Sequence, residues 1–423
     1  MREPSAVAGR DSVVIDRIGA QGDGVADTAA GAVFLPFALP GEVWPHPSTA
    51  KAPGSIVPLS DVSPQRIAPV CRHFGTCGGC VAQHMAPAVY GAWKRGIVLE
   101  AFRHRGIDAV VAPLHAIAPR SRRRATFTAR RSTGGVALGY LARASHDLCD
   151  VTACPVLAPQ IEVALPRLKD ICGRLLTGSK PPELRITVTW AKHGLDVTIN
   201  GAVSRLGAQN RIEIIGLAQQ ARIQRLLIDG EAVLAGPSPV IGLTSVDVAL
   251  PETAFLQAVP QAEAELVRLV VDAMPALTKK AAVADLFCGL GTFTFALARS
   301  ARVAAFDGDG AAVAALAQAA RHLQGAKPIE ARRRDLFREP LSLRELQGFA
   351  AVVLDPPRAG AAAQVAELAK SSVDRVVMVS CNPATLARDC RILIDGGYHL
   401  GLVTPIDQFL YSAHVEAVAV LTK

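Results

Sequence analysis

The residue of this sequence best suited to nucleophilic chemistry is a cysteine that stands between an apolar run and a proline. Residues 375–380 read Arg-Val-Val-Met-Val-Ser, and Cys381, Asn382 and Pro383 follow. The run predicts a buried strand, and asparagine followed by proline is typical of a helix N-terminus. A thiol attacks as the thiolate, which the positive end of a helix dipole favours. We therefore interpret Cys381 as a candidate nucleophile and Cys390, inside the predicted helix, as a core residue.

Carboxylates stand at the ends of two further apolar runs. Asp307 closes residues 303–307, and Asp355 follows residues 351–354 and precedes two prolines. Because the carboxyl ends of parallel strands meet at one edge of a sheet, where ligands bind, we expect both carboxylates to lie near Cys381. Asp307 stands where ribose hydroxyls are usually held; a helix N-cap aspartate is the alternative interpretation.

A glycine turn precedes these strands. The stretch Asp285-Leu-Phe-Cys-Gly289-Leu-Gly291 predicts a strand, a turn and the start of a helix, where backbone N–H groups can approach a ligand. The turn lacks the third glycine of the dinucleotide-binding pattern, so by itself it does not identify the ligand. Asp335, after the basic residues 332–334, is placed to close an adenine pocket or to be an ordinary loop residue.

A second group of chemically active residues is a cysteine cluster. Cys71, Cys77 and Cys80 fall within ten residues, interrupted by glycines that let the backbone wrap around an ion or a cluster. Cys154 is the best candidate for a fourth ligand, and Cys149 is its competitor. The chain has nine cysteines, and this odd number argues against a disulfide framework. Spacing alone does not separate an iron–sulfur cluster from a structural zinc.

Composition limits the class of protein. With 423 residues, 50% of them hydrophobic, the chain is long enough for two to four domains with buried cores. It contains no export signal and no apolar run long enough for a membrane span, so we expect a cytoplasmic protein without a membrane partner. The net charge of +8 favours polyanionic partners.

The elements that must position these residues change along the chain. Residues 1–60 have the short apolar runs and turn residues of a small β-barrel, and residues 61–248 are strand-rich and predict a central α+β domain. In residues 249–423 apolar runs alternate with helical segments, which is typical of a doubly wound α/β sheet. Six arginines between residues 120 and 131 predict either a phosphate-binding surface or a solvated charged face.

The ordered motifs resemble one enzyme family. They look like those of the S-adenosylmethionine-dependent RNA 5-methyluridine methyltransferases, which include the 23S rRNA uracil-C5 enzymes. The motifs are Asp285-Leu-Phe-Cys-Gly-Leu-Gly291, Asp355-Pro-Pro-Arg-Ala-Gly360, Ser380-Cys-Asn-Pro383, Asp407-Gln-Phe and His414-Val-Glu416.

The resemblance extends over nearly the whole chain and implies three modules. Residues 1–60 resemble a TRAM domain, an OB-like barrel that binds RNA, and residues 249–423 resemble a Rossmann-like class I methyltransferase domain. Residues 61–248 would be a central iron–sulfur domain, of which residues 83–114 pack with the catalytic domain. A [4Fe–4S] cluster would be held by Cys71, Cys77, Cys80 and Cys154. We also expect a monomer.

Carried over residue by residue, the resemblance makes Cys381 the nucleophile and Glu416 the base. It places five residues around the cofactor or the uracil: Gln257, Phe287, Asp307, Asp335 and Asp355. Three positions depart from the family pattern and affect the cofactor contacts: Thr292 and Asp335 stand where relatives carry Asn, and Val259 replaces the Asn of an F-x-Q-x-N motif.

The expected reaction is methyl transfer from S-adenosylmethionine to C5 of one uridine through a covalent adduct between Cys381 and uracil C6, with 23S rRNA as the expected substrate. Methylation of the tRNA T-loop is the alternative within the family. A non-catalytic RNA-binding metalloprotein and a nicotinamide-dependent oxidoreductase are alternatives from other classes. The presence of both Cys381 and Glu416 argues against the metalloprotein, and the oxidoreductase does not explain the Ser380-Cys-Asn-Pro383 motif.

Overall fold

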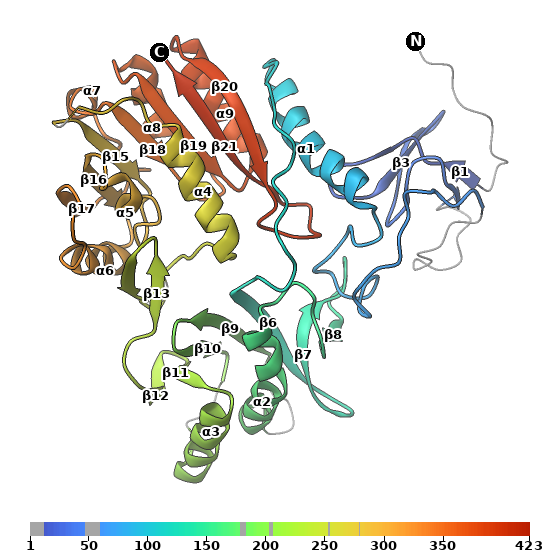
Figure 1. The fold of residues 1–423 in the computed structure, drawn as a ribbon. Helices are drawn as coiled ribbons and strands as arrows, with labels where there is room; N and C mark the ends of the chain where they lie inside the picture. Colours follow the sequence, from blue (N-terminus) through green and yellow to red (C-terminus); the bar gives the residue numbers. More distant parts are fainter. Residues whose placement is uncertain (1–11, 47–59, 178–182, 203–205, 253, 279) are drawn as a thin grey trace.

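The computed structural model describes residues 12–46, 60–177, 183–202, 206–252, 254–278 and 280–423. Figure 1 shows a C-terminal α/β part, a central part that lies below it in this view, and a group of short N-terminal strands beside them. A helix from the first quarter of the chain lies between the N-terminal strands and the C-terminal sheet.

The C-terminal part is built on a seven-stranded sheet. Its strands follow one another in this order: β17 (Ile329–Arg333), β16 (Arg302–Asp307), β15 (Ala282–Leu286), β18 (Ala351–Leu354), β19 (Arg375–Ser380), β21 (Glu416–Thr422) and β20 (His399–Ile406). The first five are parallel to one another, and β21 is antiparallel to both of its neighbours. The order reverses beside β15, which places a ligand-binding crevice at the carboxyl ends of β15 and β18.

Helices cover both faces of this sheet. They are α4 (Pro260–Asp272), α5 (Thr294–Leu297), α6 (Gly310–Ala320), α7 (Leu343–Leu346), α8 (Ala362–Lys370) and α9 (Pro383–Asp395). The strands β18 and β19 are buried along nearly their whole length, because one face packs against α8 and α9 and the other against α4. A strand covered on both faces needs apolar side chains at successive positions, which explains the continuous apolar runs of β18 and β19.

The early helix α1 (Pro87–Arg103) packs on the C-terminal sheet. Val98 and Phe102 are buried in the same core as residues of β19 and α9. The segment that follows runs beside β20, where Val111 bridges Val403 and His115 bridges Ile406. Residues 87–115 thus complete the core of the C-terminal part, as the position of α1 in Figure 1 illustrates.

The central part is a second seven-stranded sheet. Its strand order is β12 (Glu231–Ala235), β11 (Ile223–Ile228), β10 (Gly194–Asn200), β9 (Leu184–Ala191), β6 (Arg124–Ser132), β7 (Gly135–Leu141) and β8 (Leu148–Asp150). The helices α2 (Pro159–Leu175) and α3 (Ala208–Gln220) pack against its buried face. A hairpin of β13 (Val240–Leu243) and β14 (Val246–Ala249) packs against α6 of the C-terminal part.

The N-terminal strands form two small sheets. One pairs β1 (Ser12–Val14) with β5 (Val43–Pro45), and the other joins β2 (Arg17–Ile18), β3 (Gly24–Thr28) and β4 (Gly31–Leu35). Val13, Ile15, Ala26 and Trp44 share one apolar core. The described residues alone do not close into a barrel, and residues 1–11 and 47–59 of the predicted barrel lie outside the described residues.

The six arginines of residues 120–131 differ in exposure: Arg123 is buried, Arg122, Arg124 and Arg130 are partly buried, and Arg120 and Arg131 are exposed. Arg123 is only 5% exposed and pairs with Glu263 of α4 at 2.5 Å. Arg124 donates to the Ala254 carbonyl at 2.6 Å, and Arg131 donates to the Leu176 carbonyl at 3.1 Å. The prediction of an exposed face is therefore wrong for Arg123, which an acceptor distant in the sequence holds inside the protein, and it stays a prediction for the exposed Arg120 and Arg131.

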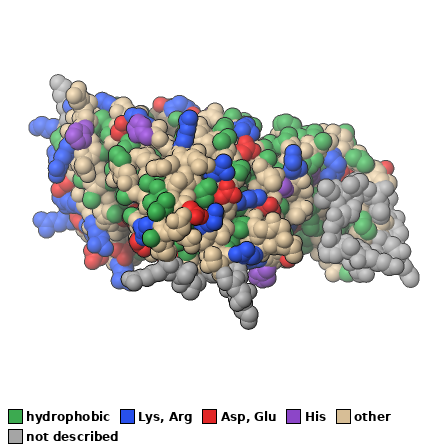
Figure 2. All heavy atoms as spheres, turned by 90° about the horizontal axis from the view of Figure 1, so that it is seen from below, with side chains coloured by type: hydrophobic (Ala, Val, Ile, Leu, Met, Phe, Trp, Pro, Cys, Tyr) green, Lys and Arg blue, Asp and Glu red, His purple; other side chains and the backbone are tan. Residues whose placement is uncertain are grey.

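Charge is dispersed over the face drawn in Figure 2, where basic side chains alternate with acidic and apolar ones. The net charge of +8 therefore does not gather into one basic field on that face. Among the described residues, no helix is both long enough and apolar enough to cross a membrane.

Candidate active site

Strand register places Cys381 opposite Glu416. The last residue pair between β19 and β21 is Ser380 with Ala417, Cys381 follows the first strand, and Glu416 begins the second. Since the strands are antiparallel, the two side chains meet at the carboxyl edge of the sheet. Glu416 is 2% exposed, so its carboxyl group lies inside the protein rather than on its surface.

The turn that carries Cys381 is held by its neighbours. Asn382 caps α9 by accepting a hydrogen bond from the Ala384 N–H at 3.1 Å, which confirms the predicted helix start. The side-chain amide of Asn382 donates to the Arg358 carbonyl at 3.0 Å, and the Thr385 hydroxyl donates to the same oxygen at 3.2 Å. These bonds bring the turn after β18 beside Cys381.

The environment of Cys381 raises the pKa of its thiol. Burial, followed by the carboxylates of Glu416 and Asp355, raises the pKa of Cys381 to about 11, whereas Arg358 acts in the opposite direction. The sequence indicated a thiolate favoured by the start of α9. The sign is wrong because burial, followed by the two carboxylates, outweighs the helix terminus.

Two amides connect the two carboxyl groups. Gln257 Nε2 donates to Asp355 Oδ2 at 2.9 Å, and Gln408 Nε2 donates to Gln257 Oε1 at 2.7 Å and to Glu416 Oε2 at 3.0 Å. Burial raises the pKa of Glu416 to about 8, against the hydrogen bond from Gln408. Burial, followed by the charge of Glu416, also raises the pKa of Asp355 well above its usual range. Acids in this state are suited to proton transfer near neutral pH.

The glycine turn after β15 forms the other end of the site. Phe287, Gly289 and Gly291 all have positive φ, and a Cβ atom added to Gly289 would meet only open space. The Gly289 N–H donates to Asp307 Oδ2 at 2.9 Å, which ties the turn to the end of β16. An open backbone cradle beside a carboxylate is the arrangement that binds the ribose of a nucleoside cofactor.

A buried carboxyl group lies under this turn. Asp285 is fully buried, and its Oδ2 accepts a hydrogen bond from Thr294 at 2.5 Å. Its Oδ1 has no hydrogen-bond partner among the described residues. Burial raises the pKa of Asp285 to about 7. An unpartnered buried acceptor at this turn fits a ligand that carries positive charge or donor groups, as S-adenosylmethionine does.

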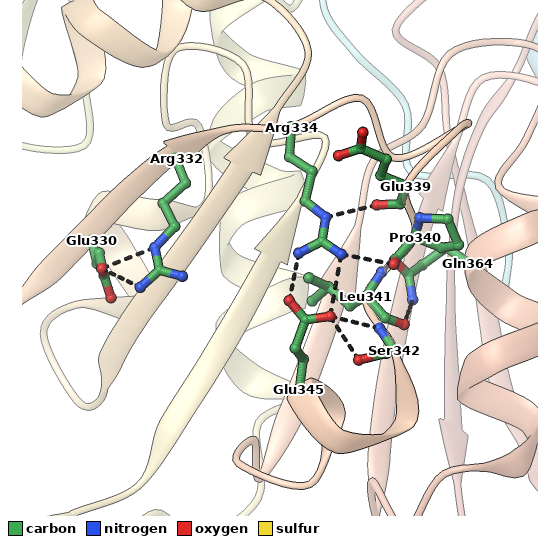
Figure 3. Close-up of polar contacts among 9 residues, drawn as sticks. All are labelled: Glu330, Arg332, Arg334, Glu339, Pro340, Leu341, Ser342, Glu345 and Gln364. Atoms are coloured by element: carbon green, nitrogen blue, oxygen red, sulfur yellow. Dashed lines mark hydrogen bonds and ion pairs between the residues drawn. The ribbon is translucent and has the colours of Figure 1, made fainter.

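The loop after β17 carries Asp335. The Arg334 N–H donates to the Asp307 carbonyl at 2.8 Å, which brings Asp335 beside the end of β16. The Arg334 side chain holds the rest of the loop, because it donates to the carbonyls of Glu339 at 2.7 Å and Pro340 at 2.9 Å and pairs with Glu345 at 2.5 Å (Figure 3).

Two aromatic side chains lie beside Asp335, between the loop after β17 and the glycine turn. The rings of Phe287 and Phe337 lie 5.4 Å apart between centroids, and Phe337 is 49% exposed. The Asp335 carboxylate accepts from the Phe337 N–H at 3.1 Å. Apolar rings next to an exposed carboxylate offer one stacking surface and one acceptor for a nucleobase.

The cysteine cluster lines a cavity of about 640 Å³ between the central and C-terminal parts. Four cysteines line it: Cys71, Cys77, Cys80 and Cys154. Gln408, whose side chain donates to Glu416, and His414 also line this cavity. Within the described residues no three His, Cys, Asp or Glu side chains are grouped so that they could hold a single metal ion. Four thiols around one cavity are nevertheless a donor set that suits an iron–sulfur cluster.

Sequence reasoning named most of the residues that meet here. The residues at the two ends of the site are Gln257, Phe287, Asp307, Asp335, Asp355, Cys381 and Glu416. It missed the parts played by Gln408 and Thr294. The motif Asp407-Gln-Phe contained Gln408, but only the fold places this amide between two acids.

The strand order, the glycine turn and the acidic strand ends together define a class I S-adenosylmethionine-dependent methyltransferase fold. Residues 183–423 match the model of the family described as tRNA (Uracil-5-)-methyltransferase. The chain belongs to this family, and it is an S-adenosylmethionine-dependent RNA uracil-5-methyltransferase.

Similar proteins cover almost the whole chain. An uncharacterized RNA methyltransferase of Brucella suis biovar 1 is 46% identical over 97% of this chain and 97% of its own length. The 23S rRNA (uracil(1939)-C(5))-methyltransferase RlmD of Nitrosospira multiformis is 31% identical over 97% of this chain and 98% of its own. The structure of Pyrococcus abyssi tRNA (uracil-54, C5)-methyltransferase with S-adenosyl-L-homocysteine has a TM-score of 0.75 at 22% identity and covers 98% of this chain and 100% of its own.

Proposed function

We propose that this enzyme methylates C5 of one uridine in 23S rRNA through a covalent bond between Cys381 Sγ and uracil C6. The observation that carries the proposal is the meeting of the Cys381 thiol with the buried carboxyl groups of Glu416 and Asp355 beside the glycine turn. The relative named as a 23S rRNA methyltransferase, alike over its full length, supports ribosomal RNA as the substrate. Methylation of the tRNA T-loop remains the second candidate, since the protein of similar fold is named as a tRNA enzyme.

In the proposed reaction the Cys381 thiolate adds to C6, and the electron pair of the C5–C6 double bond moves to C5 and O4 as an enolate. S-adenosylmethionine, when bound, would supply an electrophilic methyl group to C5, and the electron pair of its broken S–CH₃ bond would stay on sulfur, giving S-adenosylhomocysteine. Once C5 carries the methyl group, Glu416 takes the C5 proton, the C5–C6 double bond forms again and the C6–S bond breaks. Cys381 leaves as the thiolate and Glu416 is left protonated, so that atoms and electrons balance.

The remaining predicted residues would hold the reactants. Asp307 would accept from ribose hydroxyls, and Phe287 and Asp335 would line the adenine pocket. Asp355 and Gln257 lie between this pocket and Glu416, and would orient the uracil or the methyl donor. Because neither reacting edge of a uracil is accessible in a stacked helix, the uridine must be flipped out of the RNA.

The accessory parts would hold the RNA. We propose that Cys71, Cys77, Cys80 and Cys154 bind a [4Fe–4S] cluster with a structural role in the central domain of residues 61–248. The cluster would join the loop of residues 71–80 to the loop before α2, which already meet where His73 Nε2 and Thr152 Oγ1 lie 3.3 Å apart. Residues 1–60 would bind RNA as a TRAM-like barrel, next to the catalytic domain of residues 249–423.

The test uses a 23S rRNA fragment that carries 5-fluorouridine, with S-adenosylmethionine present. Fluorine at C5 blocks the final elimination, so the wild-type enzyme should form a covalent complex that survives denaturing electrophoresis. Cys381→Ala should form none. An undiminished complex in Cys381→Ala would reject the nucleophile, and a complex with a T-loop RNA instead of the 23S fragment would favour the second candidate.

A further inference from the structure

Gln408 occupies a position between the two acids of the site that the proposed reaction does not yet use. Gln408 is buried, and its side-chain Nε2 donates to Glu416 Oε2 at 3.0 Å and to Gln257 Oε1 at 2.7 Å. Both amide hydrogens are thereby committed. Gln257 Nε2 in turn donates to Asp355 Oδ2 at 2.9 Å.

The acids fix the direction of this amide chain. In their ionised forms both acids only accept hydrogen bonds, so in this state Gln257 presents its NH₂ group to Asp355 and its oxygen to Gln408. Gln408 must then present its NH₂ group both to that oxygen and to Glu416. A side chain oriented from two sides holds one oxygen of Glu416 in place and leaves the carboxylate its second oxygen for the C5 proton.

The loop that carries Gln408 is held by α1. Lys94, fully buried, pairs with Asp407 Oδ1 at 2.9 Å and donates to the carbonyls of Phe409, at 3.1 Å, and His414. Tyr90 makes two more contacts, since its hydroxyl donates to Asp407 Oδ2 at 2.7 Å and accepts from the Tyr411 N–H at 2.8 Å.

These contacts have a common result. Burying a lysine costs free energy of desolvation unless its ammonium group is paired. Among the described residues, the ion-pair and hydrogen-bond partners of Lys94 all belong to the loop of residues 407–414. Both ends of the loop are therefore attached to α1, and Gln408 follows directly after the attached Asp407.

We propose that Gln408 is a positioning residue for the base Glu416, and that Lys94 and Tyr90 hold Gln408 in place by fixing the loop of residues 407–414. This inference rests on the proposed function, in which Glu416 removes the C5 proton. Gln408 stabilises the carboxylate form of Glu416, the form that can accept a proton. Without this hydrogen bond Glu416 would stay protonated over a wider pH range, and the covalent adduct would persist.

The hydrogen bond from Gln408 acts against burial, which raises the pKa of Glu416, and other charged groups lie around this site. The charge of Glu416 acts on Asp355 from β18 and on the Cys381 thiol after β19, and Asp285 of β15 acts on Asp355 in turn. The cations nearby are Arg358, beside Cys381, and Lys94, which contacts the loop rather than Glu416. Burial raises the pKa of Glu416 to about 8, and the bond from Gln408 lowers it.

The direct test is Gln408→Met, which keeps the length of the side chain and removes its donors. Formation of the adduct and its release are measured separately with uridine RNA across the neutral and alkaline range. Adduct formation does not require a base at C5, and a Glu416 that stays neutral no longer raises the pKa of Cys381, so formation should be as fast as in wild type or faster. Release should slow by about 10- to 100-fold at neutral pH, and its midpoint should move to higher pH. An unchanged release midpoint, or an equal loss in both steps, would overturn the positioning role.

The anchoring by α1 needs its own variant. Lys94→Met alone would leave Asp407 buried and unpaired, so we pair it with Asp407→Leu, which removes both charges. The double variant should show the same release defect as Gln408→Met, and adding Gln408→Met to it should cause little further loss, because all three changes act through one contact. A folded double variant with wild-type release would show that α1 does not hold Gln408.

Glu416→Gln separates this inference from the proposed function. If Glu416→Gln accumulates the adduct on uridine RNA while Gln408→Met behaves as wild type, only the positioning role is wrong. If Glu416→Gln turns over as wild type, the assignment of the base is wrong and the inference fails with it.

Discussion

Burial and the neighbouring carboxylate of Glu416 both hold the proton on the Cys381 thiol and raise its pKa to about 11. The two side chains approach because they flank the last residue pair of β19 and β21. A nucleophile in this state is mostly a neutral thiol at neutral pH, so the free enzyme carries little thiolate.

The rate of adduct formation should therefore rise with pH. Below the thiol pKa the thiolate fraction grows about tenfold per pH unit, so the rate measured with 5-fluorouridine RNA should climb through the neutral and mildly alkaline range. Saturating RNA and S-adenosylmethionine keep binding constant in this measurement. A rate that is flat from mildly acidic to alkaline pH would contradict the raised pKa of Cys381.

Glu416→Gln should affect the two halves of the reaction in opposite ways. Removing the negative charge lowers the pKa of Cys381, so the pH profile of adduct formation should shift to lower pH. Release should stop, because an amide does not accept the C5 proton. The measurement is single-turnover kinetics on 5-fluorouridine RNA for formation and on uridine RNA for release. An unshifted formation profile would show that the Glu416 charge does not act on Cys381.

The sequence predicts some residues of this site and not others, and the difference lies in how each residue is positioned. Asp307, Asp355 and Cys381 each end a parallel strand, and parallel strands in one sheet bring their carboxyl ends together whatever the side chains are. Glu416 begins an antiparallel strand, so only the register with β19 places it, and the residues alone suggest an ordinary strand carboxylate.

Other features depend on partners far away in the sequence. The apolar patterns do not indicate that Glu263 accepts from Arg123, so an exposed basic face is the natural prediction for residues 120–131. The predicted sign of the Cys381 pKa shift is wrong for a related reason, because local helix chemistry is visible in a sequence, whereas burial and two distant carboxylates are not. The connection of Gln408 to α1 through Asp407 and Lys94 is equally non-local.

Arg123→Met should destabilise the protein strongly. It leaves Glu263 buried and unpaired, which costs about 3–5 kcal/mol of unfolding free energy. Burial lowers the pKa of Arg123 and raises that of Glu263, so desolvation outweighs the attraction between them. The double variant Arg123→Met with Glu263→Leu should therefore recover most of the loss in urea unfolding.

The exposed ion pair between Arg120 and Glu162 is the matched control. The Arg120 side chain is 51% exposed, so Arg120→Gln should cost only about 0–1 kcal/mol. Equal losses in Arg120→Gln and Arg123→Met would show that burial does not set the strength of these contacts.

Asp285→Asn should change how stability depends on pH. The folded pKa of Asp285 is about 7 against an ordinary 3.8, so the folded state binds the proton more tightly than the unfolded chain does. Stability from this group is complete below the ordinary pKa and is lost as pH rises from about 4 to about 7. The amide carries no proton to lose. The stability of Asp285→Asn minus that of wild type should therefore increase over this range in urea unfolding, and a constant difference would contradict the raised pKa.

The fourth cluster ligand can be identified by comparing two cysteines. Cys154 lines the cavity with Cys71, Cys77 and Cys80, whereas Cys149 is buried in β8. Protein purified without oxygen should be brown and contain about four irons and four sulfides per chain. Cys154→Ser should lose most of this iron, and Cys149→Ser, the matched control, should keep it. Loss in Cys149→Ser alone would exchange the two assignments, and a colourless wild-type protein that contains zinc would replace the cluster by a structural ion.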